Sequence, residues 1–378
     1  PIIKGMPIFY ISIEPNQMRL IDKVIKPEIK TLKRIKDTFN DRYEYLRLDK
    51  NERLLPFNDV VFQEFLSALK QVELSGYPEL GNIYRKLANY LEVSEEQIML
   101  ASGSDLAIKS IFDACIGIGD NIILHAPCYA MYRIYAEMFG AEPRMVPIQD
   151  NWTVNHESML KQVNKKTKFV ALENPNGFIG SQPQFKIIEK CAEELLDKST
   201  LLVIDEAYYY IENTTSQTIK LIEKYPNVII SQTFSKGHGL AGARIGYIIG
   251  NTEMIEHISR VRPMHEISGL TAIATDWILK NPKLLKEYQI EISNSKIYLK
   301  KRLDKINIKY RDTHANFMLL YLPDKGKTKD ITNKLRRYHN ILIRRPFEEL
   351  QMKGWSRVCI GSVSDSQRFI SALNDILD

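Results

Sequence analysis

The stretch from Ile229 to Tyr247 reads IISQTFSKGHGLAGARIGY, and it decides the predicted fold. A β-branched strand ends at small hydroxyl residues, and Lys236, a glycine-rich turn and Arg244 follow it. A buried lysine beside hydroxyl groups and a second cation is favoured as a neutral amine, which can form a Schiff base with an aldehyde. Taken alone, the stretch also fits a surface lysine that follows a strand.

The glycines of this stretch imitate a dinucleotide-binding fingerprint. Gly237, Gly239 and Gly242 match G-x-G-x-x-G, but that fingerprint requires a helix to begin at the glycines. Here the chain runs within a few residues into the apolar segment 245–249, which is typical of another strand. A dinucleotide enzyme is therefore the weakest functional candidate.

Composition and charge narrow the class of protein. The chain has 378 residues, of which 44% are apolar and 10% aromatic, which favours a globular protein of about two domains. The formal charge of +6 comes from lysines and arginines interspersed with acidic residues. A nucleic-acid partner would require a concentrated basic face, so the pattern favours small anionic substrates instead.

The cysteines and the apolar runs predict the compartment. The four cysteines contain no C-x-x-C pair, so we interpret them as reduced core thiols and expect no metal site. No apolar run reaches the length of a membrane span, and residues 1–13 lack the basic start and cleavage site of a signal peptide. These observations predict a cytoplasmic protein without a membrane partner.

Strands and helices alternate through the middle of the chain. Short apolar runs at 97–101, 121–124, 168–172, 201–204 and 228–230 predict strands, and segments such as 106–115 and 187–196 have helical spacing. Such alternation predicts an α/β fold, in which helices cover a mostly parallel sheet and ligands bind beyond the strand ends. Asn174, Asp205 and Lys236 each follow a predicted strand end, so we expect them to lie together.

A second strand-to-helix junction has the composition of an anion site. Ser102-Gly103-Ser104-Asp105 follows the strand at 97–101 and precedes a helix. Free backbone N–H groups and the helix dipole at such a junction attract anions. An ordinary N-cap by Ser104 or Asp105 explains the same residues equally well.

The pattern divides the chain into three parts. Residues 1–45 are expected to form an arm and a helix, which Pro27 breaks or kinks. Residues 46–268 form the predicted large domain, of which 46–75 are an alternative part of the small domain. Residues 269–378 have the pattern of a smaller α+β domain, with strands at 315–320, 341–345 and 357–361 and a closing helix.

These motifs occur together in a known family. From about Leu46 onward the chain resembles the fold-type I enzymes that use pyridoxal 5′-phosphate, specifically the class I/II aminotransferases and their histidinol-phosphate aminotransferase branch. The resemblance implies that Lys236 forms the Schiff base and moves a proton at the substrate Cα, and that Asp205 pairs with the pyridine nitrogen.

The resemblance also implies the other cofactor contacts. Tyr129 would stack on the ring, with a plain core position as the less favoured alternative, and Asn174 and Tyr208 would bond its hydroxyl oxygen O3′. The cofactor phosphate would be held by four residues, namely Ser104, Asp105, Ser235 and Arg244.

Further residues resemble those that bind substrate and partner. Tyr77, in the turn 76–79, would reach the cofactor phosphate of a second subunit, which implies a homodimer with shared sites. Arg357 would bind the substrate α-carboxylate, with Asn316 beside it. Arg344 would bind a substrate phosphate, although Arg345 competes with it for this role and a surface position is an equal alternative.

One segment departs from the family pattern. The family run N-P-N-N-P-T-G is replaced here by NPNGFIG at 174–180. We keep Asn174 as the expected cofactor contact, but the altered loop predicts a specialised substrate.

Three functions remain open. The first is an aminotransferase acting on a small amino compound, phosphorylated or not. The second is a decarboxylase of a phosphorylated amino acid of the phosphoserine or phosphothreonine type, since both reactions begin from the same bound species and no motif distinguishes them. The third is a cofactor-binding regulator, which the absence of a helix-turn-helix pattern before the body disfavours.

Overall fold

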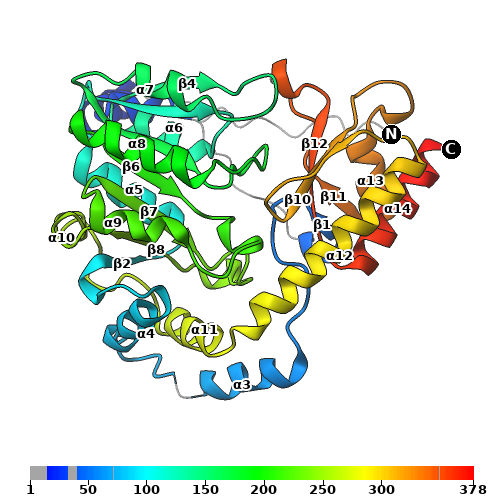
Figure 1. The fold of residues 1–378 in the computed structure, drawn as a ribbon, viewed down its shortest axis with the longest axis horizontal. Coiled ribbons are helices and arrows are strands. Elements are labelled where there is room, and N and C mark those ends of the chain that lie inside the picture. The colour runs from blue at the N-terminus through cyan, green and yellow to red at the C-terminus, as the bar shows by residue number, and fades with distance from the viewer. Residues whose placement is uncertain (1–14, 33–40, 71, 349) are drawn as a thin grey trace.

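The computed structural model describes residues 15–32, 41–70, 72–348 and 350–378. Two bodies face each other: a large one built on a seven-stranded sheet, and a smaller one containing the C-terminus (Figure 1). Of the predicted N-terminal arm, residues 1–14 and 33–40 lie outside the described residues. Among the described helices, none is both long and apolar enough to cross a bilayer.

The large sheet confirms the predicted mostly parallel α/β fold. Its strand order is β2-β8-β7-β6-β5-β3-β4, and only β8 runs antiparallel to its neighbours. The strands are β2 (Ile98–Ala101), β3 (Asn121–Ala126), β4 (Glu142–Pro147), β5 (Thr167–Glu173), β6 (Leu201–Asp205), β7 (Val228–Thr233) and β8 (Gly246–Gly250). The glycine-rich turn leads into β8 through one short 3-10 turn (Ala241–Ala243), as the analysis of the fingerprint predicted.

Successive residues of each strand point to opposite faces of this sheet, and each face has its own core. Leu172 and Ile204 pack into one core with α4 (Gly81–Leu91), α7 (His156–Lys161), α8 (Phe185–Asp197), α9 (Leu221–Lys224) and α11 (Gly269–Lys280). Ala171 and Val203 pack into the other with α5 (Ser104–Cys115), α6 (Ala130–Met138) and α10 (Thr252–Ser259). Asp205 and Glu173 continue this second set, since each lies two residues after a member of it.

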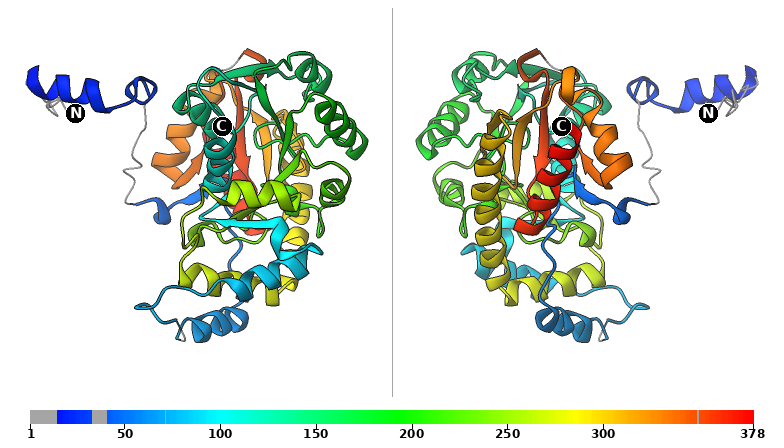
Figure 2. Two further views of the ribbon diagram at one scale, coloured as in Figure 1. Left: turned by 90° about the vertical axis from the view of Figure 1, so that its left-hand side faces the viewer. Right: turned by 90° about the vertical axis from the view of Figure 1, so that its right-hand side faces the viewer.

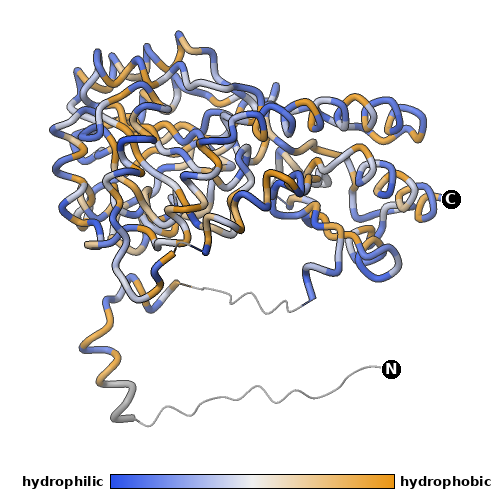
Figure 3. Tube along the Cα trace, turned by 90° about the horizontal axis from the view of Figure 1, so that it is seen from below, coloured by the Kyte–Doolittle hydropathy of each residue, from blue (hydrophilic) through white to orange (hydrophobic). Residues whose placement is uncertain are grey.

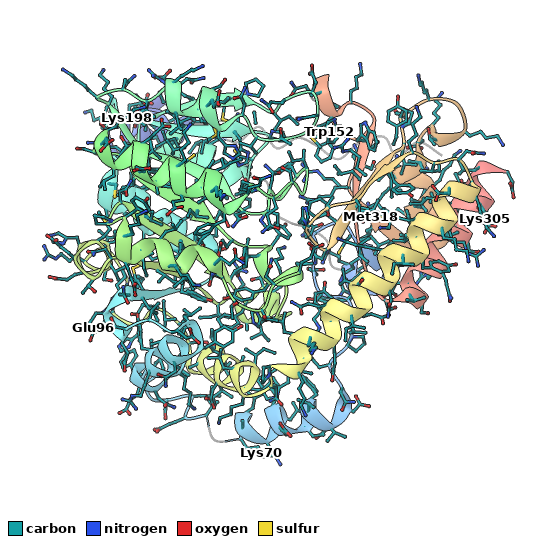
Figure 4. The ribbon with its side chains drawn as sticks, viewed as in Figure 1. Lys70, Glu96, Trp152, Lys198, Lys305 and Met318 are labelled. Atoms are coloured by element: carbon teal, nitrogen blue, oxygen red, sulfur yellow. The ribbon has the colours of Figure 1, made fainter. Side chains whose placement is uncertain are left out.

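The small body is built from both ends of the chain. Strand β1 (Leu46–Leu48) pairs in parallel with β11 (Ile341–Ile343), and β10 (Phe317–Tyr321) lies between β9 (Tyr310–Arg311) and β12 (Trp355–Cys359). Its helices are α12 (Lys283–Lys305), α13 (Ile331–His339) and α14 (Val363–Leu377). Met318, on β10, lies inside this core (Figure 4).

The body boundaries differ from the predicted ones at two points. Helix α11 was assigned to the small domain, but Trp277 and Ile278 belong to the core of the large body. Helix α3 (Asp59–Leu69) packs on α11, and the Trp277 indole N–H donates to the Val61 carbonyl at 3.0 Å. Residues 46–55 instead contribute to the small core, so the segment 46–75 is divided between the bodies. This division depends on the pairing of β1 with β11 and the packing of α3 on α11, which the sequence alone does not show.

The N-terminal helices stand beside the body. Helix α1 (Pro15–Val24) is followed by α2 (Pro27–Lys30), which contacts α6, so Pro27 begins a new helix where a break was predicted. Helix α1 projects from the molecule in Figure 2, and its apolar residues appear in orange in Figure 3. Leu20, Ile21 and Val24 are exposed.

Side chains join the two bodies across the junction. Trp152 of the large body, labelled in Figure 4, lies on the side of the small body. Its ring contacts that of Trp355 on β12, with centroids 5.2 Å apart. Glu212 follows the 3-10 turn Tyr209–Ile211 and accepts from His314 Nδ1 at 2.8 Å, and the Lys296 ammonium lies 3.4 Å from its other oxygen. Asp312 faces the same group and pairs with Lys296 and Lys300. This polar cluster links α12 and the segment before β10 to the large body.

The His314–Glu212 contact predicts a pH-dependent stability. The hydrogen bond to Glu212 raises the pKa of His314, so its contribution is complete below about pH 6.5 and is lost as the pH rises through the raised value. Because the imidazole is about half exposed, we expect a contribution of no more than about 1 kcal/mol. Thermal unfolding of the wild type and of His314→Gln should differ more at pH 5.5 than at pH 8.5. An equal difference at both pH values would contradict the assignment.

Candidate active site

A cavity of about 330 Å³ lies at the carboxyl ends of the central strands, where the large body faces the small one. Nine predicted site residues line it, namely Ser104, Asp105, Tyr129, Asp205, Tyr208, Ser235, Lys236, Arg244 and Arg357. Nine further lining residues were given no individual role from the sequence, namely Lys50, Glu52, Glu173, Pro175, Gly177, Phe178, Ala207, Thr233 and Ala241. The topology therefore gathers residues that lie up to about three hundred positions apart in the chain.

Lys236 lies at the centre of the cavity wall, three residues after the end of β7. Its ammonium donates to the Lys50 carbonyl at 3.0 Å and lies 5.5 Å from the centre of the Tyr208 ring. The Tyr208 hydroxyl in turn accepts from the Asn51 amide at 3.0 Å. The polar segment after β1 therefore forms one side of the lysine's surroundings, although the sequence shows no link between the two.

Asp205 is a buried carboxyl at the end of β6. Its oxygens accept from the Ala207 N–H at 3.0 Å and from the Tyr132 hydroxyl at 3.2 Å, both uncharged donors. Burial raises its pKa to about 7, and the Glu173 carboxylate beside it acts in the same direction. A cationic group brought against Asp205 would remove this penalty, so the site fits a protonated ring nitrogen.

The N-terminus of α5 forms a cradle at the other end of the cavity. Helix α5 begins at Ser104 after Gly103, whose φ of +85° favours glycine. The Arg244 guanidinium lies close to Gly103. A Cβ built at Gly103 would be 2.5 Å from the Arg244 Nη2 atom. Ser235 and Thr233 add hydroxyls from the end of β7. Unpaired N–H groups, a cation and hydroxyls together fit a phosphate group.

Arg357, on β12 of the small body, is a cationic residue that lines the cavity. Arg357 is 8% exposed as a residue, and its guanidinium lies 5.5 Å from the centres of both the Phe178 and the Phe317 rings. One Nη donates to the Gly177 carbonyl at 2.7 Å, and among the described residues its buried Nε–H has no partner. An N–H left unpaired inside a cavity fits a bound carboxylate.

The structure corrects three predicted contacts. Asn174 does not line the cavity: its amide donates to Glu206 at 2.9 Å, within a cluster that includes Ser216, Thr218 and Gln232. It points away because Glu173, its neighbour on β5, points inward.

The side chain of Asn316 is also turned away, because its amide donates to the Asn51 carbonyl and the Tyr288 hydroxyl in the small core. Arg344 lies behind the cavity wall, over the rings of Phe178 and Phe347. Arg345 lines a different cavity, beside α13. Neither arginine lines the central cavity.

Tyr77 lies outside this single-chain cavity. Its ring is 82% exposed and stacks on His265 with centroids 4.3 Å apart, so it is open to contact from outside the chain. Its predicted role in a second subunit's site stays a prediction.

The fold is that of the fold-type I pyridoxal-phosphate enzymes. Comparison of the sequence with family models identifies the family within this class. The model of the family described as aminotransferase class I and II matches residues 44–373, so the chain belongs to that family. The predicted family is thus confirmed.

Individual relatives point to the branch. The chain is similar to the histidinol-phosphate aminotransferase of Sulfurisphaera tokodaii, with 30% identity over 346 residues that cover 90% of this chain and 93% of the relative. It shares its fold with the crystal structure of histidinol-phosphate aminotransferase from Sinorhizobium meliloti in complex with pyridoxal-5′-phosphate (TM-score 0.84, 23% identity, 94% and 97% of the two chains). L-threonine-O-3-phosphate decarboxylase from Porphyromonas gingivalis has the same fold (TM-score 0.74, 20% identity, 88% and 99%).

The close contact between β8 and the start of α5 predicts that substitution of Gly246 weakens cofactor binding. A Cβ at Gly246 of β8 would lie 2.1 Å from the Ser104 backbone nitrogen, so Gly246→Ala must push α5 away. Such overpacking costs about 1–3 kcal/mol, so we expect pyridoxal 5′-phosphate to bind roughly 5- to 150-fold more weakly in a fluorescence titration. Gly242→Ala is the matched control, because a Cβ at Gly242 meets no atom within 4 Å. Equal affinities of the two variants would contradict the cradle.

Proposed function

We propose that the chain is a pyridoxal-phosphate-dependent aminotransferase whose amino substrate is histidinol phosphate. Family membership and the named relatives support this choice. The observation that carries it is the arrangement of Lys236 between the phosphate cradle of α5 and the buried Asp205 carboxyl. A specialised amino compound was expected from the altered loop at 174–180, and the relatives favour the parent substrate over that expectation.

The cofactor's contribution is that of an electron sink for a bond at the substrate Cα. Ser104, Ser235 and Arg244 would hold its phosphate, and Asp205 would hold its ring nitrogen in the protonated state. Lys236 would carry it covalently as a Schiff base and, once released, would move the proton at the substrate Cα with its amine. Tyr129 would cover one ring face, and Tyr208 would bond the ring hydroxyl.

The two substrates of an amino transfer place different demands on Arg357. Histidinol phosphate has a phosphate and no carboxylate, whereas an amino-acid partner such as glutamate has an α-carboxylate. The unpaired Nε–H of Arg357 fits the carboxylate of this partner. A second subunit would complete the phosphate cradle through Tyr77, so we also propose a homodimer.

Product analysis tests the reaction. Purified protein with histidinol phosphate and 2-oxoglutarate should form glutamate, and formation should stop when the keto acid is omitted. Release of CO₂ from phosphoserine or phosphothreonine without any keto acid would instead establish the decarboxylase. Neither product from an enzyme loaded with cofactor would contradict both reactions.

Arg357→Lys should impair the amino-acid half of the reaction. Lysine keeps the charge but loses the two parallel hydrogen bonds, which costs about 2–4 kcal/mol, or roughly 30- to 1000-fold in kcat/KM for glutamate. Simple amines should react at nearly the wild-type rate. Arg345→Lys is the control, because that side chain lines another cavity. Equal losses for glutamate and for amines would contradict a carboxylate-binding role.

Tyr77→Phe tests the shared site. Removal of the hydroxyl should accelerate loss of the cofactor during dialysis without changing the mass measured by light scattering or the thermal unfolding midpoint. A wild-type protein that is monomeric and fully active would refute the shared site.

A further inference from the structure

Two carboxyl groups, and not one, face the cavity from neighbouring strands. Glu173 ends β5 and Asp205 ends β6, and the two residues are paired in the register of the sheet. Both are buried, with 5% and 4% exposure, and both line the cavity. The proposed function uses Asp205 only, so Glu173 is a buried acid without an assigned role.

The strand order places Glu173 at a definite side of the cavity. The phosphate cradle follows β2 and β7, Asp205 ends β6, and Glu173 ends β5, which is the next strand away from the cradle. Neighbouring strands lie about 4.8 Å apart, so Glu173 is roughly 10 Å along the sheet from the end of β7. In pyridoxal 5′-phosphate the hydroxyl follows the aldehyde carbon on the side away from the phosphate. If a bound ring spanned from the cradle to Asp205, Glu173 and Tyr208 would therefore be the residues beside its hydroxyl edge.

Two backbone N–H groups, one before α6 and one in the loop after β5, hold the Glu173 carboxyl in this position. One oxygen accepts from the Tyr129 N–H at 2.5 Å, and the other accepts from the Gly177 N–H at 2.6 Å. The Gly177 carbonyl in turn accepts from Arg357 at 2.7 Å. Glu173 thus connects the turn before α6, the loop after β5 and the arginine of the small body.

The altered loop makes room for this acid. Gly177 occupies the position of the third asparagine in the run N-P-N-N-P-T-G. A Cβ built at Gly177 would lie 2.9 Å from the Tyr208 ring and 3.2 Å from the Glu173 carboxylate. A side chain at 177 would therefore displace the Tyr208 ring and press against the Glu173 carboxylate. Relative to that run, the loop has no amide side chain at 177, and the Glu173 carboxylate lies next to this position.

We propose that Glu173 is a cofactor-binding residue, which presents a carboxyl group to the hydroxyl edge of the pyridoxal ring and holds Tyr129 and Gly177 around that edge. This inference rests on the proposed function. Its consequence is electrostatic, because an ionised Glu173 adds a negative charge beside the hydroxyl and the neighbouring Schiff-base nitrogen. That charge favours the protonated, cationic form of the nitrogen.

The surroundings of Glu173 raise the pKa of its carboxyl group. Burial raises the pKa of Glu173 to about 7, and the N–H groups of Gly177 and Tyr129 and the charge of Arg357 partly oppose the increase. His125, 3.8 Å away on β3, is neutral because burial lowers its pKa to about 4. The titratable and charged groups that face Glu173 are Asp205, His125, Cys128, Tyr132 and Arg357. Once a ring nitrogen pairs with Asp205, the repulsion from Asp205 is offset and Glu173 ionises more readily.

The test is the absorbance of the loaded enzyme as a function of pH, because the colour of the cofactor reports the proton on the Schiff-base nitrogen. Glu173→Gln removes the charge and should lower the midpoint of this titration by about one to two pH units, the size expected for a unit charge at roughly 6–10 Å and an effective dielectric constant near 20. Glu173→Asp keeps the charge and should stay within about half a unit of the wild type. Glu206→Gln is the matched control, since Glu206 is equally buried but bonds Asn174 and Ser216 on the other face of the sheet.

The outcomes separate this inference from the proposed function. A Glu173→Gln variant that retains the cofactor and titrates at the wild-type midpoint would overturn the inference alone. If that variant does not fold, Glu173→Asp decides: a midpoint lowered by more than one unit would show that the charge is not the cause and overturn the inference. A wild-type protein that shows no cofactor absorbance at any pH would overturn the proposed function itself.

Discussion

The buried carboxyl of Asp205 is the constraint on which the site depends. Its partners are an amide and a phenol, and the nearest like charge is on the adjacent strand, so the folded protein holds an acid whose ionisation burial opposes. Such a group is costly unless a ligand compensates it. In the proposed function a protonated ring nitrogen would do so. The residues of the phosphate cradle, Lys236 and Tyr129 line the same cavity as Asp205.

The site also requires contact between the large and the small body. The large sheet supplies the cradle, Lys236 and both acids, whereas Arg357 comes from β12 of the small body. The contact of Arg357 with the Gly177 carbonyl, the packing of Tyr208 on Phe317 and the contact of Trp152 with Trp355 fix the relation between them. Strand β1 pairs with β11 and so brings the segment after it, with Lys50 and Glu52, into the same cavity. The site is thus a property of the junction and not of either body.

The local sequence was enough to predict which residues at strand ends line the cavity. It failed for residues whose position depends on the face of the sheet to which a side chain points. Lys236, Asp205 and Ser104 could be predicted because a strand followed by small or polar residues at the end of a parallel sheet defines the ligand side. Asn174 was wrong as a cavity residue, because the register that pairs Glu173 with Asp205 turns Asn174 toward Glu206. A shift of one residue moves a side chain to the other face, and no local pattern reports that register. Asn316 and Lys50 depend on contacts between distant segments, which the sequence likewise does not show.

The proposed function requires a covalent link between the cofactor and Lys236, so the decisive measurement is to locate that link. Borohydride reduction of the loaded enzyme, followed by peptide mapping with mass spectrometry, identifies the lysine that carries the pyridoxyl group. The account predicts a single modified peptide containing Lys236, three residues beyond β7 and facing Tyr208. The other cavity lysine, Lys50, provides the alternative. A pyridoxyl group on Lys50, or no modified lysine in an enzyme that holds the cofactor, would contradict it.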